Sequence, residues 1–426
     1  MKNNAREYFD EKLGERYFAA KLESGLDVYV FPKKMTVSYA LIGADFGSLA
    51  KRITLDGKER EYPMGVAHFL EHKLFSCEDG SDAFEKFAAL GADANAYTSF
   101  SKTVYLFSCT DNFYESLEQL LSFVSSPYFS EEGVERERSI IEQEIRMCDD
   151  SPYDRVSRNL LYAMYGDCVI SENACGSVES ISGISADTLY ENYGLFYRPS
   201  NMALVVCGDV DKDRVIELAK TFSPKAQIKG EVTVKYPDIT EEVFKPYFEQ
   251  KMPVGKPIFE LGVKDAHVPN DPIKRLRRDV AMTVLDEILF SRAGELYGDM
   301  LDEGLITPSY SYGYSMSKEL AFHSIFGESD EPKKVLERVR AHIEKAKKNG
   351  ISKSDFLRCK RVLQAEFIRD FDSTDDIANS LIDFAFDGAQ VFEYRRAIEE
   401  LTYEDVCKCL EEAFCDEYFA LSVICE

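Results

Sequence analysis

The sequence predicts an α+β protein made of two similar domains. Its 426 residues are too many for one ordinary hydrophobic core, and a hydrophobic content of 45% with 12% aromatic residues is ample for burial. Short apolar runs typical of strands alternate with longer stretches whose apolar residues recur every three or four positions, as on a buried helix face. The second half of the chain repeats this outline, so we expect the α+β arrangement twice.

The first half opens with a pattern of charged and aromatic residues at 5–20 that suggests a short helix. Apolar runs then predict a strand at 25–32, which Pro32 ends, and a second strand at 37–47. These two strands look paired across the short turn at 33–36.

Further along, the turn residues Asp56–Gly57 and the helix-ending residues Gly91 and Pro127 mark where elements stop. The expected elements there are helices at 66–75, 81–91, 113–124 and 130 to about 147, and strands at 92–98 and 103–108. In the second half we expect strands at 258–263, 321–326 and 418–424, and helical segments at 271–301, 331–348 and 353–370.

Residues 66–75 carry the strongest functional signal. Their apolar side chains recur at offsets of three and four, which predicts a buried amphipathic helix. His68 and His72 are one turn apart, so both imidazoles leave the same helix face and could bind one metal ion, with Glu71 nearby. The order H-x-x-E-H is the reverse of the commoner H-E-x-x-H zinc peptidase motif.

A histidine on an apolar helix is more often a core residue than a metal ligand, but here two of only five histidines lie four residues apart. A catalytic zinc ion needs a third protein ligand and an open fourth position. Glutamates crowd the helix expected at 130–147. Glu137 and Glu144 share a face of that helix, whereas Glu142 points about 160° away from Glu144. Only one of these faces can lie toward the metal.

Composition argues against several classes of function. Lys and Arg number 51 against 76 Asp and Glu, and the net charge of −25 argues against nucleic acid or an anionic membrane as partner. The chain has no apolar run of membrane-spanning length and no apolar core of a signal peptide at its start, so we expect a cytoplasmic protein. The eleven cysteines form no C-x-x-C pair, which favours reduced thiols.

Several segments fit one family pattern. They are H-F-L-E-H at 68–72, N-A-Y-T at 95–98, E-R-S-I-I-E-Q-E at 137–144, Y-R-P-S-N-M at 197–202 and V-V-C-G-D-V at 205–210. Together they resemble the inverted-motif zinc peptidases of the pitrilysin, insulin-degrading enzyme and mitochondrial processing peptidase family. The resemblance covers most of residues 25–210 and is weaker beyond them.

The resemblance implies roles for individual residues. His68, His72 and Glu144 would bind one Zn²⁺ ion per chain and leave the fourth position to a water molecule. Glu71 would take a proton from that water, and Glu137 would support the ligands from outside the coordination sphere.

The resemblance also implies a substrate and an architecture. An extended, unstructured peptide would pair with the strand that contains Asn95, Ala96, Tyr97 and Thr98. Two domains, each a mainly antiparallel sheet packed with helices, would face each other across a chamber. We therefore predict a zinc-bearing catalytic domain at 1–226, an interdomain linker at 227–257, and a related, metal-free domain at 258–426.

One departure from the family pattern concerns a segment like L-R-E-x-x-x-L-x-Y, whose arginine and tyrosine contact the substrate in members that act alone. This chain has Asp302 where the arginine would be, while Tyr310, Tyr312 and Tyr314 are candidates for the tyrosine. The departure suggests a homodimer, or a heterodimer with a related chain that supplies the arginine.

The sequence thus favours a zinc metalloendopeptidase, acting alone or as the catalytic subunit of a heterodimer. Two alternatives stay open. One is a scaffold subunit that holds the metal without turnover, and the other is a factor that binds a ribosomally made peptide. Hydrolysis of an unstructured peptide separates the first function from both alternatives.

Overall fold

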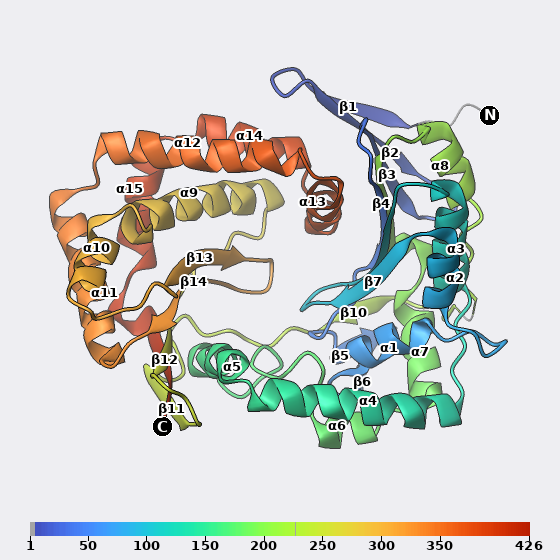
Figure 1. The fold of residues 1–426 in the computed structure, drawn as a ribbon, viewed down its shortest axis with the longest axis horizontal. Coiled ribbons are helices and arrows are strands. Elements are labelled where there is room, and N and C mark those ends of the chain that lie inside the picture. The colour runs from blue at the N-terminus through green and yellow to red at the C-terminus, as the bar shows by residue number, and fades with distance from the viewer. Residues whose placement is uncertain (1–4, 226) are drawn as a thin grey trace. The chain divides into compact units, whose positions relative to one another are not determined.

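The structure is a computed structural model that describes residues 5–225 and 227–426 (Figure 1). The chain forms two compact units, each assembled from separate stretches of sequence. The first unit contains the chain up to Ile145, Asn173–Tyr236 and Ile368–Phe386, and the second contains Arg146–Glu172, Pro237–Phe367 and Asp387–Glu426. Both units are α+β, as predicted. The boundaries predicted at 226 and 258 follow the order of the chain and stay a prediction.

The first unit is built on a seven-stranded sheet of order β1-β2-β3-β9-β4-β8-β7. Its strands are β1 (Arg6–Asp10), β2 (Glu15–Lys21), β3 (Asp27–Pro32), β4 (Ser38–Ala44), β7 (Asp93–Thr98), β8 (Thr103–Cys109) and β9 (Met202–Gly208). All neighbours are antiparallel except β3 and β9. β4 and β9 are buried along their whole length and form the centre of the sheet. Among the described strands, β7 forms one edge.

Two predictions for this sheet are wrong. Residues 5–20 form the β1–β2 hairpin instead of a helix, and the rings of Tyr8 and Tyr17 stack across it with centroids 4.8 Å apart. β3 and β4 are not paired with each other, because β9 lies between them and pairs with both. A short turn between two strands suggests a hairpin, and the insertion of a strand from far along the chain has no local signal.

Helices cover both faces of the sheet (Figure 1). α2 (Ala83–Leu90), α3 (Phe113–Ser125) and α8 (Lys212–Ala219) lie against one face, and α13 (Thr374–Asp387) lies on the other. Although α13 comes late in the sequence, a Cβ atom at Gly43 of β4 would lie 2.5 Å from Ile382 Cδ1. Tyr97 of β7 also donates a hydrogen bond of 2.9 Å to Asn379. α13 therefore packs on this sheet, and all of its residues except Asp387 belong to the first unit.

The other elements of the first unit surround the candidate site described below. The remaining helices are α1 (Val66–Leu74), α4 (Glu131–Asp150), α6 (Val178–Ser182) and α7 (Ala186–Phe196), and a small sheet contains β5 (Arg52–Leu55), β6 (Lys58–Glu61) and β10 (Val232–Val234). α4 begins in this unit and ends in the second. The predicted helices at 66–75, 81–91, 113–124 and 130–147 match α1, α2, α3 and α4 within a few residues.

The second unit contains a five-stranded sheet of order β11-β15-β12-β14-β13, in which only β11 and β15 are parallel. Its strands are β11 (Tyr247–Lys251), β12 (Ile258–Lys264), β13 (Ser311–Met316), β14 (Ala321–Glu328) and β15 (Phe419–Cys425). Its helices are α5 (Pro152–Tyr165), α9 (Pro272–Phe290), α10 (Glu295–Asp302), α11 (Pro332–Asn349), most of α12 (Lys353–Asp370), α14 (Val391–Glu400) and α15 (Tyr403–Ala413). The segment predicted as one helix at 271–301 is α9 and α10, interrupted after Phe290.

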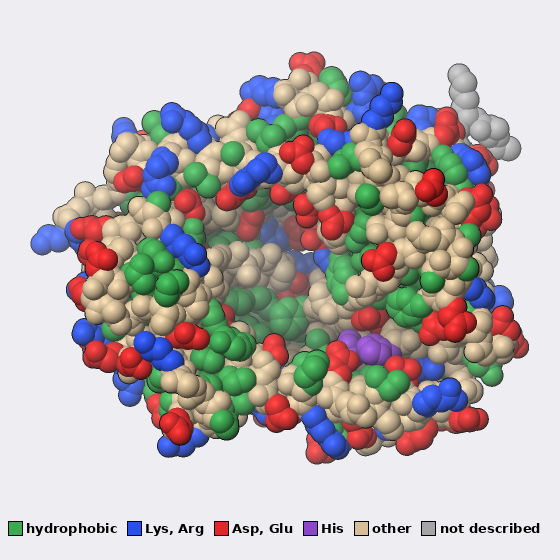
Figure 2. All heavy atoms as spheres, viewed as in Figure 1, with side chains coloured by type: hydrophobic (Ala, Val, Ile, Leu, Met, Phe, Trp, Pro, Cys, Tyr) green, Lys and Arg blue, Asp and Glu red, His purple; other side chains and the backbone are tan. Residues whose placement is uncertain are grey.

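The surface reflects the composition. Acidic side chains are numerous on the face that Figure 2 shows, with basic side chains between them. All eleven cysteines fall within the described ranges, and none of them forms a disulfide bond. Among the helices described, none has the length and apolar character needed to cross a membrane.

Candidate metal centre

α1 presents two histidines and a glutamate from a buried helix. It begins after Gly65, whose φ of 91° is a conformation that glycine adopts without strain. Apolar residues of α1 pack into the core of the first unit, while His68 and Glu71 are each only 8% exposed. The imidazole rings of His68 and His72 have centroids 4.6 Å apart. Both rings therefore leave the same face of α1, as their spacing of four residues predicts.

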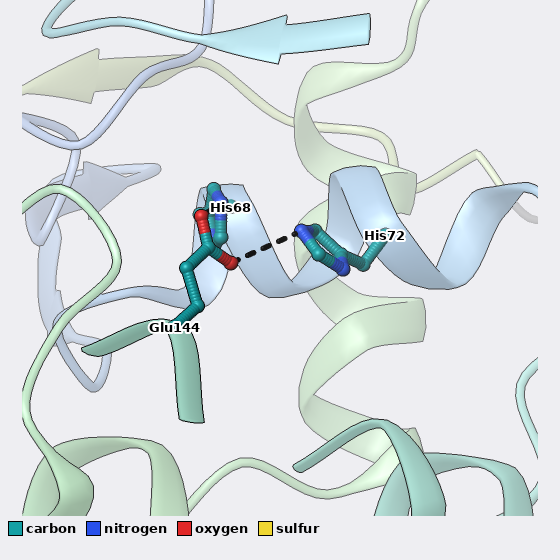
Figure 3. Close-up of side chains that lie close together, drawn as sticks. All are labelled: His68, His72 and Glu144. Atoms are coloured by element: carbon teal, nitrogen blue, oxygen red, sulfur yellow. Dashed lines mark ion pairs between the residues drawn. The ribbon is translucent and has the colours of Figure 1, made fainter. Parts of the chain in front are cut away.

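α4 brings a glutamate to these rings (Figure 3). Glu144 Oε1 lies 3.6 Å from Nε2 of His68, and Glu144 Oε2 lies 3.6 Å from Nε2 of His72. One ligand atom from each of the three residues can be chosen so that all three atoms lie within 4.8 Å of one another. The structure therefore brings together the three residues predicted as metal ligands.

The three side chains fit a zinc ion. A separation of 3.6 Å is too long for a hydrogen bond, so the carboxylate approaches both imidazoles without bonding to them directly, as ligands around an ion do. Nδ1 of His68 is buried and has no hydrogen-bond partner among the described residues. Two imidazoles and one carboxylate are a donor set that catalytic zinc sites use, with the fourth position open.

Glu137 lies beside the cluster, two helical turns before Glu144. Its Oε1 atom is 3.1 Å from Nδ1 of His72. Burial would raise the pKa of Glu137, but the hydrogen bond with His72 and nearby positive charges outweigh it and lower that pKa. An ionised Glu137 can accept the Nδ1 proton of His72, and Nε2 of that ring faces Glu144.

Glu71 is close to the cluster but outside it. Thr98 Oγ1 donates a hydrogen bond of 2.6 Å to Glu71 Oε2. Burial raises the pKa of the Glu71 carboxyl, although His68 and the hydrogen bond from Thr98 partly oppose the increase. A carboxylate whose pKa moves toward neutrality is suited to accept and return a proton.

The four residues predicted to bind peptide lie on β7, at the edge of the sheet. The structure gives them different partners. Thr98 contacts Glu71, Tyr97 bonds to Asn379 of α13, and the Asn95 side chain accepts a hydrogen bond from the N–H of Ala96 at 2.8 Å. Only Thr98 thus has a direct hydrogen bond to a predicted catalytic side chain within the described structure.

One residue at the site was missed by the sequence interpretation. Cys175 Sγ lies 3.7 Å from Nε2 of His68 and 4.0 Å from Oε1 of Glu144. It follows Glu144 by a whole helix and a loop, and nothing in the spacing of the cysteines signals this proximity. Only the return of the chain to the first unit at Asn173 brings it there.

In the second unit the candidate substrate tyrosines all have hydrogen-bond partners. The hydroxyl of Tyr310 donates to the carbonyl oxygen of Phe290, that of Tyr312 to Glu287, and that of Tyr314 to Asp265. Asp302, which stands where the family arginine would be, is the last residue of α10. These contacts give each tyrosine a structural role inside the second unit.

Comparison with known proteins identifies the family. The family model described as insulinase (peptidase family M16) matches residues 57–173, and that described as peptidase M16 inactive domain matches residues 183–363. The uncharacterized zinc protease YmfH of Bacillus subtilis is 35% identical over 408 residues, which are 94% of this chain and 95% of that protein. The zinc protease PqqE of Helicobacter pylori is 25% identical over 366 residues, 83% of this chain and 81% of that protein.

Solved structures of similar fold include peptidases of the same kind. An M16-like peptidase from Alicyclobacillus acidocaldarius superposes with a TM-score of 0.90 at 27% identity, covering 100% of this chain and 99% of that one. A protease from Helicobacter pylori has the same fold, with a TM-score of 0.81 at 19% identity over 97% of this chain and 100% of that one. The family resemblance predicted from the H-x-x-E-H segment is thereby confirmed. The chain belongs to the insulinase family of zinc peptidases, peptidase family M16.

Proposed function

We propose that this chain is an active zinc metalloendopeptidase that hydrolyses unstructured peptides and binds one zinc ion. The observation that carries the proposal is the position of Glu71. Its buried carboxylate lies on the same helix as His68 and His72, outside the group that those two histidines form with Glu144. Hydrolysis by an activated water molecule requires a base beside the metal ligands. A carboxylate that is not itself a ligand can serve as that base.

The chain's own residues would divide the work as follows. When held by His68, His72 and Glu144, zinc supplies Lewis-acid polarisation of the peptide carbonyl and makes a water molecule more acidic. Glu71 takes a proton from the attacking water and returns it to the leaving amine. Glu137 fixes the tautomer of His72.

The edge strand β7 supports a peptide substrate. Its outer edge has no neighbouring strand in the described sheet, so its main-chain N–H and C=O groups can pair with an added extended segment. Thr98, at the end of β7, touches Glu71, which would bring a peptide on this edge close to the proposed base. Main-chain pairing depends little on side chains, and we therefore expect broad sequence tolerance.

We also propose that a second chain completes the enzyme. Asp302 replaces the arginine of the family segment, and a second copy or a related chain would supply that positive charge. The alternative is a subunit that binds zinc or peptide without turnover. The family model described as the inactive domain matches residues 183–363, which do not include the candidate metal centre. The experiment below distinguishes the two.

The test is hydrolysis of a quenched, unstructured peptide by the purified chain, with zinc measured in the same sample. We expect about one zinc ion per chain, and loss of turnover in Glu71→Gln while zinc is retained. Glu132→Gln is the matched control, because Glu132 is an exposed glutamate of α4 whose side chain is 88% accessible. Turnover retained in Glu71→Gln would contradict the assigned role.

If wild-type chain holds zinc without turnover, the purified chain is not self-sufficient. Addition of a related chain then decides between the proposals. Restored hydrolysis supports the heterodimer, and continued inactivity with tight peptide binding supports the binding subunit.

A further inference from the structure

Cys175 stands at the candidate metal centre, and its role is not part of the peptidase mechanism above. Its Sγ atom lies 3.7 Å from Nε2 of His68 and 4.0 Å from Oε1 of Glu144. In a tetrahedral zinc site with bonds of about 2.0–2.1 Å to nitrogen or oxygen and about 2.3 Å to sulfur, ligand atoms are separated by about 3.3–3.6 Å. The sulfur lies slightly beyond this separation from His68 and Glu144, and it stands outside the group that these two residues form with His72.

The backbone at Cys175 is held against the start of α1. A Cβ atom at Gly65 would lie only 2.4 Å from the carbonyl oxygen of Cys175, and one at Gly176 would lie 2.5 Å from the carbonyl oxygen of Met64. Both glycines have positive φ, 91° and 83°. The N–H of Cys175 also donates to Oδ1 of Asn173 at 3.1 Å. The loop at Cys175 and the start of α1 therefore approach each other closely. This contact fixes the backbone of Cys175 relative to His68, the third residue of α1.

His68 points to a ligand independently of the cysteine. The residue is 8% exposed, and its Nδ1 atom has no hydrogen-bond partner in the described structure. Its other nitrogen, Nε2, faces both Glu144 and Cys175. Because Nε2 approaches the Glu144 carboxylate at 3.6 Å, beyond hydrogen-bond length, this pair fits a metal ion between the two groups better than a direct contact.

We propose that Cys175 is a fourth protein ligand that closes the metal centre when no peptide is bound. The inference rests on the proposed zinc site and goes beyond it, because a centre with four protein ligands has no open position. After losing its proton to solvent, the Cys175 thiolate would offer its sulfur to the metal in place of the water molecule. Peptide binding then has to displace the sulfur before hydrolysis, which makes Cys175 a brake on turnover.

Cobalt substitution tests this directly. Co²⁺ bound to a thiolate has a sulfur-to-metal charge-transfer band in the near ultraviolet, which histidine and carboxylate ligands do not produce. We expect this band in the wild-type chain loaded with one Co²⁺ and its loss in Cys175→Ser. Cys77→Ser is the matched control, because Cys77 is also partly exposed and contacts Lys86 instead of the metal cluster. That variant should keep the band.

Two outcomes would overturn the inference alone. They are a wild-type chain that binds one Co²⁺ without the band, and a Cys175→Ser variant that keeps the band. Either result leaves the proposed peptidase intact, because His68, His72 and Glu144 would still hold the metal. A wild-type chain that binds no Co²⁺ or Zn²⁺ would overturn the proposed function as well.

A second measurement needs no variant. Alkylation of the wild-type chain by iodoacetamide, mapped by mass spectrometry, reports the reactivity of each thiol with and without Zn²⁺. We expect zinc to slow the alkylation of Cys175 about tenfold or more, since a coordinated thiolate is shielded, and to leave the rate at Cys77 unchanged. Equal rates at Cys175 with and without zinc would contradict the proposal.

Discussion

Glu137 Oε1 lies 3.1 Å from Nδ1 of His72, and Nε2 of the same ring lies 3.6 Å from Glu144. One imidazole therefore connects two carboxylates that are two turns apart on α4. A carboxylate at Nδ1 favours a proton on that nitrogen. Because both glutamates come from one helix, the two carboxylates are positioned together relative to this imidazole.

Glu137→Gln should weaken metal binding without unfolding the chain. Glutamine still reaches Nδ1 of His72, but it has no negative charge to hold the proton there. Losses of about 10- to 100-fold in metal affinity are typical when such a partner is removed. The measurement is a competition titration with a chromophoric zinc chelator. Glu132→Gln, at an exposed position of the same helix, should bind zinc as the wild type does, and equal affinity of all three proteins would refute the role of Glu137.

Thr98→Val should reduce turnover while zinc content stays the same. The threonine hydroxyl donates to Glu71 Oε2 at 2.6 Å, and valine removes that donor with little change in shape. A hydrogen bond to a charged group contributes about 1.5–3 kcal/mol, so we expect kcat to fall about tenfold or more. Thr98→Ser keeps the hydroxyl and should retain most activity. Equal kcat values for the valine and serine variants would show that the contact does not position the base.

Most of the cluster proposed to hold zinc could be predicted from the sequence, because it depends on helical spacing. His68 and His72 are four residues apart and Glu137 and Glu144 are seven apart, and on a helix these offsets place side chains on one face regardless of what packs around them. The choice of Glu144 over Glu142 required the family pattern, since spacing alone left two faces of α4 open.

What could not be predicted depends on parts of the chain far apart in sequence. Cys175 reaches the site on a loop, and Asn379 reaches β7 on α13, so neither has a local pattern that connects it to α1. The insertion of β9 between β3 and β4 is another example. The β1–β2 hairpin is a different case, because the stacking of Tyr8 on Tyr17 depends on the pairing of two strands and has no counterpart in the pattern of either segment alone.

Gly65→Ala should destabilise the first unit more than Gly57→Ala. Both glycines have positive φ, 91° and 78°, so alanine is strained at either position. At Gly57 an added Cβ meets nothing within 4 Å, whereas at Gly65 it would lie 2.4 Å from the carbonyl oxygen of Cys175. We expect about 1 kcal/mol for Gly57→Ala and about 2–3 kcal/mol more for Gly65→Ala, measured by denaturant unfolding. Equal losses would show that the close approach of the two segments is not maintained in solution.

A carboxyl group in the second unit should make stability depend on pH. Burial, followed by the negative charge of Asp387, raises the pKa of Asp279 on α9 to about 7, although a hydrogen bond with Tyr394 partly opposes the rise. In the unfolded chain an aspartate has a pKa of about 3.9. Below that pH both states are protonated. Between about 4 and 7 the unfolded chain releases the proton while the folded chain keeps it, so the stability present in acid is lost as the pH rises through the folded-state pKa.

Asp279→Asn should remove this loss, because asparagine resembles the protonated carboxyl and still accepts a hydrogen bond at its oxygen. The melting temperature of the variant minus that of the wild type should therefore increase from pH 4 to pH 8, and the variant should be the more stable protein at pH 8. Thermal unfolding measured at unit pH steps checks this. Asp372→Asn, at an exposed position after α12, is the control and should give a constant difference. A constant difference for Asp279→Asn as well would mean that the pKa of Asp279 in the folded protein is close to its value in the unfolded chain.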